Sequence, residues 1–225
     1  MISMPALAPT TRRGSGLRPN PWASQAGTLF LLVLLCAAAH ASPGDCIDAD
    51  DAELVALVNE YRQANGLPAV VTSRWLSATA QWHLWDRANN PSAVGGICNT
   101  HSWSSVHPAG VTWQGMCYTS DHAQAAQMWA KPAQISAGRM GGNGYELAAD
   151  APSQTPANAL AQWQASPSHG PVILNQGAWA GVTFRAIGAS VSGPYAVLWL
   201  GDAQDTDVAM LPCSADNIFA TGFEA

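Results

Sequence analysis

The chain has 225 residues, of which 48% are hydrophobic and only 11% are charged. This composition can bury a substantial apolar core, which excludes a disordered polyelectrolyte. The length suits one domain with short appendages. The formal net charge is −6, and Lys131 is the only lysine. Because binding to a phosphate backbone depends on clustered basic residues, we expect no nucleic-acid partner.

The first 41 residues have the three-part layout of a secretory signal peptide. A stretch with three arginines precedes an apolar run over residues 26–39, and an Ala-His-Ala sequence then suits cleavage after Ala41. The run of about 14 residues is shorter than the roughly 20 that span a bilayer, so we expect no stable membrane span after cleavage. Cleavage would leave six basic residues against fifteen acidic ones, a formal charge of −9. We therefore expect a secreted or periplasmic protein.

Four cysteines remain beyond the signal: Cys46, Cys98, Cys117 and Cys213. An even number of cysteines in an exported protein predicts two disulfides, for which three pairings exist. We expect Cys98 to pair with Cys117 across a local loop. Cys46 and Cys213 would then join the two ends of the domain.

Two amphipathic helices are predicted in the first half of the chain. The first covers residues 50–64, with Asp50 and Glu53 in a capping-box arrangement. The second covers residues 73–89, with Ser73 as its cap. On this second helix we expect the face with three tryptophans to be buried in the core, beside an adjacent strip of other residues. The face carries Trp75, Trp82 and Trp85, and the strip carries Leu76, Ala80 and His83.

The stretch from residue 90 to residue 132 predicts a loop followed by a short helix. Residues 90–120 are rich in Gly, Ser, Pro and Thr, and a loop of this length is usually functional or cross-linked. Asp121 is expected to cap a helix that runs through Trp129 and ends at Pro132.

The second half of the chain predicts a sheet and one more helix. Residues 145–147 suggest a short extended segment, and Thr155 with Pro156 suits the start of a helix. Segments 181–191 and 195–200 predict antiparallel strands joined by a Ser-Gly-Pro turn.

Several polar residues could carry chemistry, although spacing alone does not unite them. His101, Glu146 and His169 each lie among small or aromatic neighbours. His101 and His122, together with the two middle cysteines, also match the spacing of a structural zinc site. An oxidising compartment favours the disulfide over that zinc site, because zinc needs reduced thiolates. We expect His122 to be structural.

A series of motifs resembles an SCP-like domain of the CAP superfamily, which is named for cysteine-rich secretory proteins, antigen 5 and pathogenesis-related proteins. The resemblance covers residues 50–201, between a short lead at 42–49 and an acidic tail with an apolar end at 202–225. The motifs are, in order, Asn59-x-x-Arg62, the tryptophan-rich helix, His101-Ser102, Gly144-Tyr145-Glu146, Trp163-x-x-Ser166-Pro167-Ser168-His169, Val172-Ile173-Leu174-Asn175 and the strand 195–199.

The resemblance implies an α+β fold, a three-layer α-β-α sandwich with a central, mainly antiparallel sheet. It also implies a cleft with two histidines, His101 and His169, and an acid, Glu146. These three residues would bind a divalent metal, most readily zinc, or would be catalytic in an enzyme. The second acid of the family pattern falls on Ser166, so metal binding should be weak. Ser166, Ser102 and Tyr145 would support the metal ligands from behind.

Two functions from different classes follow from this resemblance. The first is a binding module for an extracellular small molecule, lipid, peptide or cell-wall component. The second is a metal-assisted hydrolase that cleaves a peptide or cell-wall bond. The missing acid at Ser166 favours binding, because it removes a candidate base. A serine hydrolase using Ser166 or Ser102 with His169 is disfavoured, because no nucleophile elbow is present.

Overall fold

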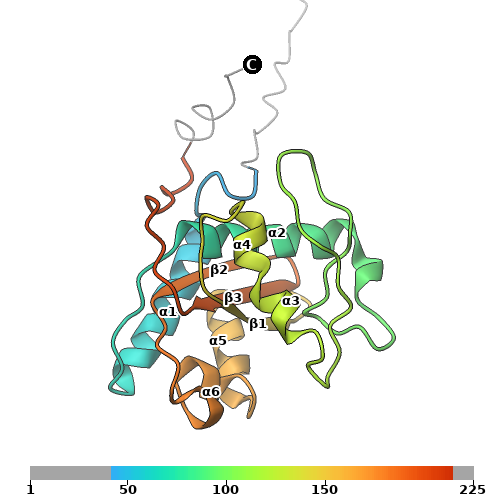
Figure 1. The fold of residues 1–225 in the computed structure, drawn as a ribbon. Helices are drawn as coiled ribbons and strands as arrows, with labels where there is room; N and C mark the ends of the chain where they lie inside the picture. The colour runs from blue at the N-terminus through green and yellow to red at the C-terminus, as the bar shows by residue number, and fades with distance from the viewer. Residues whose placement is uncertain (1–41, 215–225) are drawn as a thin grey trace, which may run out of the picture. The chain divides into compact units, whose positions relative to one another are not determined.

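The computed structural model describes residues 42–214, which lie within one compact unit. Within these residues a central antiparallel sheet has the strand order β1-β3-β2, formed by β1 (Gly144–Asp150), β3 (Tyr195–Gly201) and β2 (Ala186–Ser192). Helices cover both faces of the sheet (Figure 1). The predicted α+β sandwich is therefore confirmed. The predicted signal peptide and the apolar end of the tail lie outside the described residues.

One face of the sheet is covered by α2 (Arg74–Asn89), α3 (Ala125–Trp129) and α4 (Lys131–Ile135). As predicted, Ser73 caps α2, since its Oγ accepts a hydrogen bond from the backbone N–H of Leu76 at 3.0 Å. The prediction for the faces of α2 is confirmed in part, since the three tryptophans pack against the core cluster without being buried in it. The buried strip carries Leu76, Ala80 and His83, whereas the three tryptophans are only partly buried at its side.

The reason lies in the close approach of α2 to β2. A Cβ atom added at Gly188 would lie 2.1 Å from the backbone nitrogen of Ser77. At this separation only small or slender side chains fit between the helix and the strand, so the bulky indole rings turn to the side. Tertiary packing thus decides which strip of α2 faces the sheet.

The other face of the sheet is covered by α1 (Ala49–Ala64), α5 (Pro156–Ala165) and α6 (Gly170–Ile173). Because both faces are buried, β2 and β3 are almost continuously apolar. Thr155 caps α5 as predicted. The cap of α1 is Asp48 rather than Asp50, and its side chain accepts from the backbone N–H of Asp51 at 2.8 Å.

The segment between α2 and β1 is mostly irregular and carries short 3-10 and α-helical turns, including η1 (Pro91–Ala93). Pro132 lies in the first turn of α4 instead of ending the preceding helix, because proline is tolerated where a helix N–H has no partner. Asp121 does not cap α3. Its side chain accepts from Thr119 and from the backbone of Ala123, in a turn ahead of that helix.

Two disulfides join the chain as predicted: Cys98 to Cys117, and Cys46 to Cys213. The alternative zinc site with His101 and His122 is therefore wrong, since its two thiolates are consumed. The described part of the acidic tail packs against the start of α2. There Asp205 accepts from Ser73 and from the backbone of Trp75.

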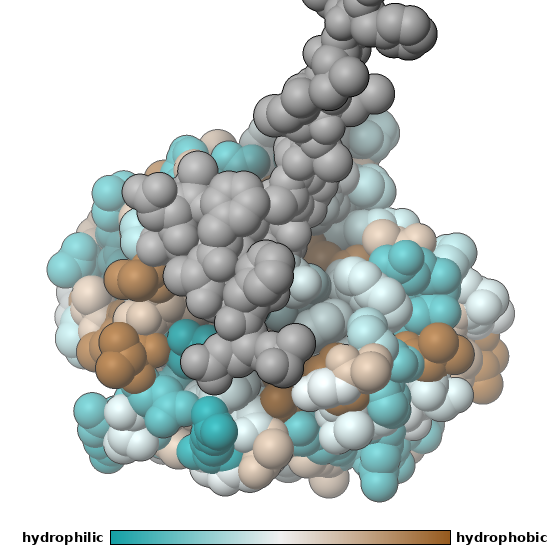
Figure 2. Space-filling model, turned by 90° about the horizontal axis from the view of Figure 1, so that it is seen from above, coloured by the Kyte–Doolittle hydropathy of each residue, from teal (hydrophilic) through white to brown (hydrophobic). Residues whose placement is uncertain are grey.

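No helix in the described range 42–214 is both long enough and apolar enough to cross a bilayer. Seen from above, the surface mixes hydrophilic and hydrophobic residues in small groups (Figure 2).

The close approach of α2 to β2 yields a prediction for stability. We expect Gly188→Ala to lower the free energy of unfolding by about 1 to 3 kcal/mol, because the new methyl group overlaps the helix backbone. Urea unfolding would measure the change. Gly181→Ala is the matched control, because no other group lies within 4 Å of that position and its φ is not in the left-handed region. Equal effects of the two substitutions would contradict this packing account.

Candidate functional site

The site is organised around the carboxylate of Glu146, near the start of the edge strand β1. Glu146 points to the same face of the sheet as Ala148, toward α2. One of its oxygens, Oε1, lies 3.1 Å from Nδ1 of His101 and 3.1 Å from Nδ1 of His83. Two imidazoles from different parts of the chain therefore meet on a single carboxylate oxygen.

His83 is a site residue that the sequence did not single out. It lies on the buried strip of α2, and its ring stacks on Trp103 with centroids 4.3 Å apart. Its Nε2 lies 3.1 Å from the backbone carbonyl oxygen of Ser102. Because a carbonyl can only accept, Nε2 carries a proton. A polar residue on the inward strip of a helix was the one signal that could have revealed this role.

Glu146 is ionised at neutral pH. Burial by itself raises the pKa of Glu146, but the nearby imidazole of His83 and the hydrogen bond from His101 outweigh burial and lower this pKa to about 2. The contact of His83 has the distance of an ion pair without the direction of a good hydrogen bond. An ionised carboxylate only accepts, so His101 donates from Nδ1 and its Nε2 is left free for a ligand.

His101 and His169 line the same cavity of about 420 Å³, which we call the histidine cleft. Its lining includes His101, Tyr118, His122, Trp129, Glu146 and His169. Burial, followed by the nearby charge of His101, lowers the pKa of His169. His169 is therefore neutral at pH 7 and can offer a lone pair.

The position of His169 depends on the Asn59-x-x-Arg62 motif of α1. His169 precedes the first residue of α6. Arg62 donates to the backbone oxygen of Ile173 and to the side chain of Asn175, which fixes the other end of α6. Asn59 exchanges two hydrogen bonds with the backbone of Val70 and so holds the chain that follows α1.

Of the three residues predicted to support the site, one is fully buried, one lines the cleft and one lies outside it. Ser102 is fully buried, and its Oγ accepts from the backbone N–H of Tyr118 at 2.9 Å. Tyr145 lines the cleft, and its hydroxyl donates to Asp202 at 3.0 Å. Ser166 ends α5, shares a hydrogen bond with Ser168 and does not line the cleft. Neither serine is hydrogen-bonded to His169, so the structure gives no support for a serine nucleophile.

The predicted ligand set of two histidines and Glu146 is not found as a metal group. Within residues 42–214, no three His, Cys, Asp or Glu side chains are grouped to hold an ion. The geometry gives Glu146 another position, behind His101, with one oxygen already shared by two imidazoles. The donor chemistry of the cleft still fits a divalent cation through two imidazole nitrogens, because Glu146 orients His101 and burial favours the uncharged form of His169.

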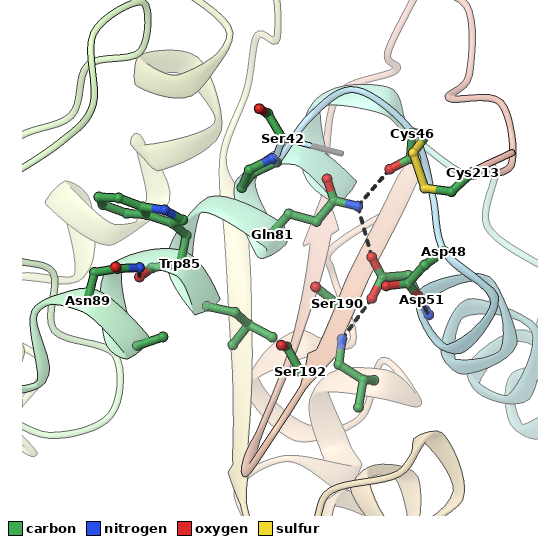
Figure 3. Close-up of a pocket in the computed structure, with 14 residues that line it drawn as sticks. Ser42, Cys46, Asp48, Asp51, Gln81, Trp85, Asn89, Ser190, Ser192 and Cys213 are labelled. Carbon is green, nitrogen blue, oxygen red and sulfur yellow. Dashed lines mark hydrogen bonds between the residues drawn. A yellow bond between two sulfur atoms is a disulfide. The ribbon is translucent and has the colours of Figure 1, made fainter. Parts of the chain in front are cut away.

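A second cavity, of about 330 Å³, lies where α1, α2 and the Cys46–Cys213 disulfide meet (Figure 3). Asp51 is buried there and accepts from Gln81 at 2.9 Å and from the backbone N–H of Val191 at 2.7 Å. Burial and the nearby Asp48 raise the pKa of Asp51 to about 7. Because these bonds join α1, α2 and β2, we assign this cluster a structural role.

The ionised Glu146 predicts a specific acid sensitivity. The pKa of Glu146 in the folded protein, about 2, is below the ordinary 4.5. Its contribution to the free energy of unfolding is therefore complete above pH 4.5 and is lost as the pH falls toward 2. This contribution is about 3 kcal/mol. We expect Glu146→Gln to be less stable at pH 7 and to lose less stability between pH 5 and pH 2.5, as measured by urea unfolding. The control Glu60→Gln, on the exposed side of α1, should keep the wild-type slope. A wild-type slope in Glu146→Gln would contradict the assignment.

No family model matches the chain, and no curated protein matches it significantly. The solved structures that are similar to it include two bacterial proteins. A cysteine-rich secretory protein from Staphylococcus aureus has 14% identity and a TM-score of 0.44 over 68% of this chain and 39% of that one. An extracellular protein containing an SCP domain, from Bacillus anthracis, has 17% identity and a TM-score of 0.44 over 68% and 40%. The chain thus spans about two fifths of the length of each structure.

Proposed function

We propose that this protein is an exported SCP-like binding module whose histidine cleft takes up a divalent cation, most readily zinc, between His101 and His169. One observation carries the proposal: Glu146 accepts from Nδ1 of His101 and leaves Nε2 available. A carboxylate behind a metal-binding histidine is a recurring arrangement, because it fixes the tautomer and the orientation of the ring.

In this proposal Glu146 orients a ligand and is not itself a ligand. The cation would have two protein ligands, fewer than the three of catalytic zinc sites, so its affinity should be modest. Its remaining positions would be open to water or to a bound molecule. A cation held in this way would supply a Lewis acid that attracts an oxygen atom of that molecule.

Binding is favoured over metal-assisted hydrolysis because the cleft, among its described residues, has no carboxylate that is free to act as a base. A hydrolase needs a base within hydrogen-bond reach of the attacking water. The carboxylate of Glu146 is buried and shared by two imidazoles, and the position of the second acid carries Ser166, away from the cleft. The role that suits these groups best is to hold a ligand without cleaving it.

Export is supported by two kinds of observation. The first 41 residues have the signal layout described above, and the two disulfides suit an oxidising compartment. We therefore place the protein in the periplasm or the medium, where its ligand would be a small molecule, a lipid, a peptide or a cell-wall component.

The proposed cation site can be tested with zinc alone. We expect His101→Ala and His169→Ala each to lower zinc affinity about tenfold or more in untagged protein at pH 7.5, measured by competition with a chelating dye. Affinity of the wild-type protein should fall on acidification, because a protonated imidazole cannot bind the metal.

His107→Ala is the matched control, because His107 is exposed and lies outside the cleft. It should bind zinc like the wild-type protein. If all three variants kept wild-type affinity, or if His107→Ala lost as much as the other two, the proposed site would be rejected.

A further inference from the structure

One wall of the histidine cleft is built of aromatic rings from three separate elements. Trp129 ends α3, Tyr145 lies on β1 and Trp179 ends η2 (Gly177–Trp179). The ring of Tyr145 lies 5.8 Å from that of Trp129 and 5.0 Å from that of Trp179, at interplanar angles of 64° and 81°. All three are partly exposed. Together they form an aromatic surface in which the rings of Trp129 and Trp179 are both steeply inclined to the ring of Tyr145.

This aromatic wall is held in place from behind. The hydroxyl of Tyr145 donates to Asp202, so the ring cannot turn freely. Phe184 packs against both Tyr145 and Trp179. A preorganised surface loses little entropy when a ligand docks on it.

The rest of the cleft combines uncharged polar groups with the apolar side chains of Ala125, Met128 and Val172. Asn99, Ser120 and Ser168 contribute side chains to the lining, beside the imidazoles. Among the described residues that line the cleft, none is Lys, Arg or Asp, and the single acid, Glu146, is already paired. The side chains of the cleft therefore offer no fixed positive charge to a phosphate or carboxylate.

His122 contributes a further polar group to the lining of the cleft. Its φ is 59°, in the left-handed region. Tyr118 holds this side chain, since its hydroxyl lies 3.0 Å from Nδ1. Nδ1 can accept from that hydroxyl, which leaves Nε2–H of His122 as a donor at the cleft.

We infer that the histidine cleft binds a pyranose unit of an extracellular glycan. A pyranose has an apolar C–H face, which suits the wall of Trp129, Tyr145 and Trp179. It also has a rim of neutral hydroxyl groups, which suits His122 and the uncharged side chains of the lining. A hydrocarbon chain would match the aromatic wall and the apolar side chains of Ala125, Met128 and Val172, but it would leave the polar groups of the lining without partners, at a cost in free energy. The volume of the cleft lies within the usual range of small-molecule sites.

This inference rests on the proposed function only in using the same cleft, since stacking on aromatic rings needs no cation. The test therefore uses the full chain, purified after export and treated with EDTA. The probes are tetramers of N-acetylglucosamine and of glucose, followed by saturation-transfer NMR and calorimetry. Decanol, which carries no charge, is the comparison ligand for a hydrocarbon occupant.

We expect at least one of the two tetramers to bind, with saturation transfer strongest at its ring protons. Trp129→Ala and Trp179→Ala should each weaken its affinity about tenfold. Trp75→Ala is the matched control, because that ring lies beside Arg74 and Arg139, outside the cleft, and it should keep wild-type binding. His122→Asn should weaken binding while the protein stays at least as stable, because asparagine adopts the left-handed conformation more readily.

Three results would overturn the inference. One is the absence of saccharide binding in both metal-free and zinc-loaded protein. Another is saccharide binding that persists in both cleft tryptophan variants. The third is displacement of the saccharide by decanol, which would identify a hydrocarbon-binding cleft. Saccharide binding in a protein that takes up no zinc would instead reject the proposed cation site and leave this inference standing.

Discussion

A single buried oxygen, Oε1 of Glu146, carries two imidazole contacts, and the geometry of the site depends on it. A carboxylate enclosed by an α-β-α sandwich is costly unless charge and hydrogen bonds compensate for its lost hydration. His83 brings that compensation from α2, and His101 brings it from the long loop. The same contacts fix the tautomer of His101. The carboxylate of Glu146 thus contributes to the stability of the fold and also orients His101 for a ligand.

The surrounding residues hold an irregular loop against a regular sheet. Cys98 and Cys117 close the loop, and Ser102 and Trp103 in it contact His83 by hydrogen bonding and by stacking. Lys131 is fully buried above Trp103 and donates to the backbone of Gln114. Burial lowers the pKa of this lysine to about 8, an effect that the charge of Glu146 partly opposes. The loop contains little regular secondary structure of its own. It is therefore fixed by a disulfide and by buried contacts with residues of the neighbouring helices.

Local patterns predicted the elements whose causes are local. Ser73 and Thr155 cap their helices, the turn before Tyr195 joins two strands, and Cys98 pairs with Cys117 across a local loop. The pairing of Cys46 with Cys213, which are 167 residues apart, was also predicted. Most of what depends on other tertiary contacts was missed. The strip of α2 that faces the sheet is selected by its approach to Gly188, so the helical pattern, which favoured the tryptophan face, gave His83 no role. The family resemblance brought His101, His169 and Glu146 together, but only the shared oxygen shows that Glu146 lies behind a histidine.

The most direct test of this account is the tautomer of His101 in metal-free protein at pH 7, measured from its imidazole ¹⁵N chemical shifts. The hydrogen bond to Glu146 predicts a proton on Nδ1 and a bare Nε2, and Glu146→Gln should disturb this state. A His101 ring with its proton on Nε2, or shifts unchanged in Glu146→Gln, would contradict the claim that the buried carboxylate prepares this histidine for a ligand.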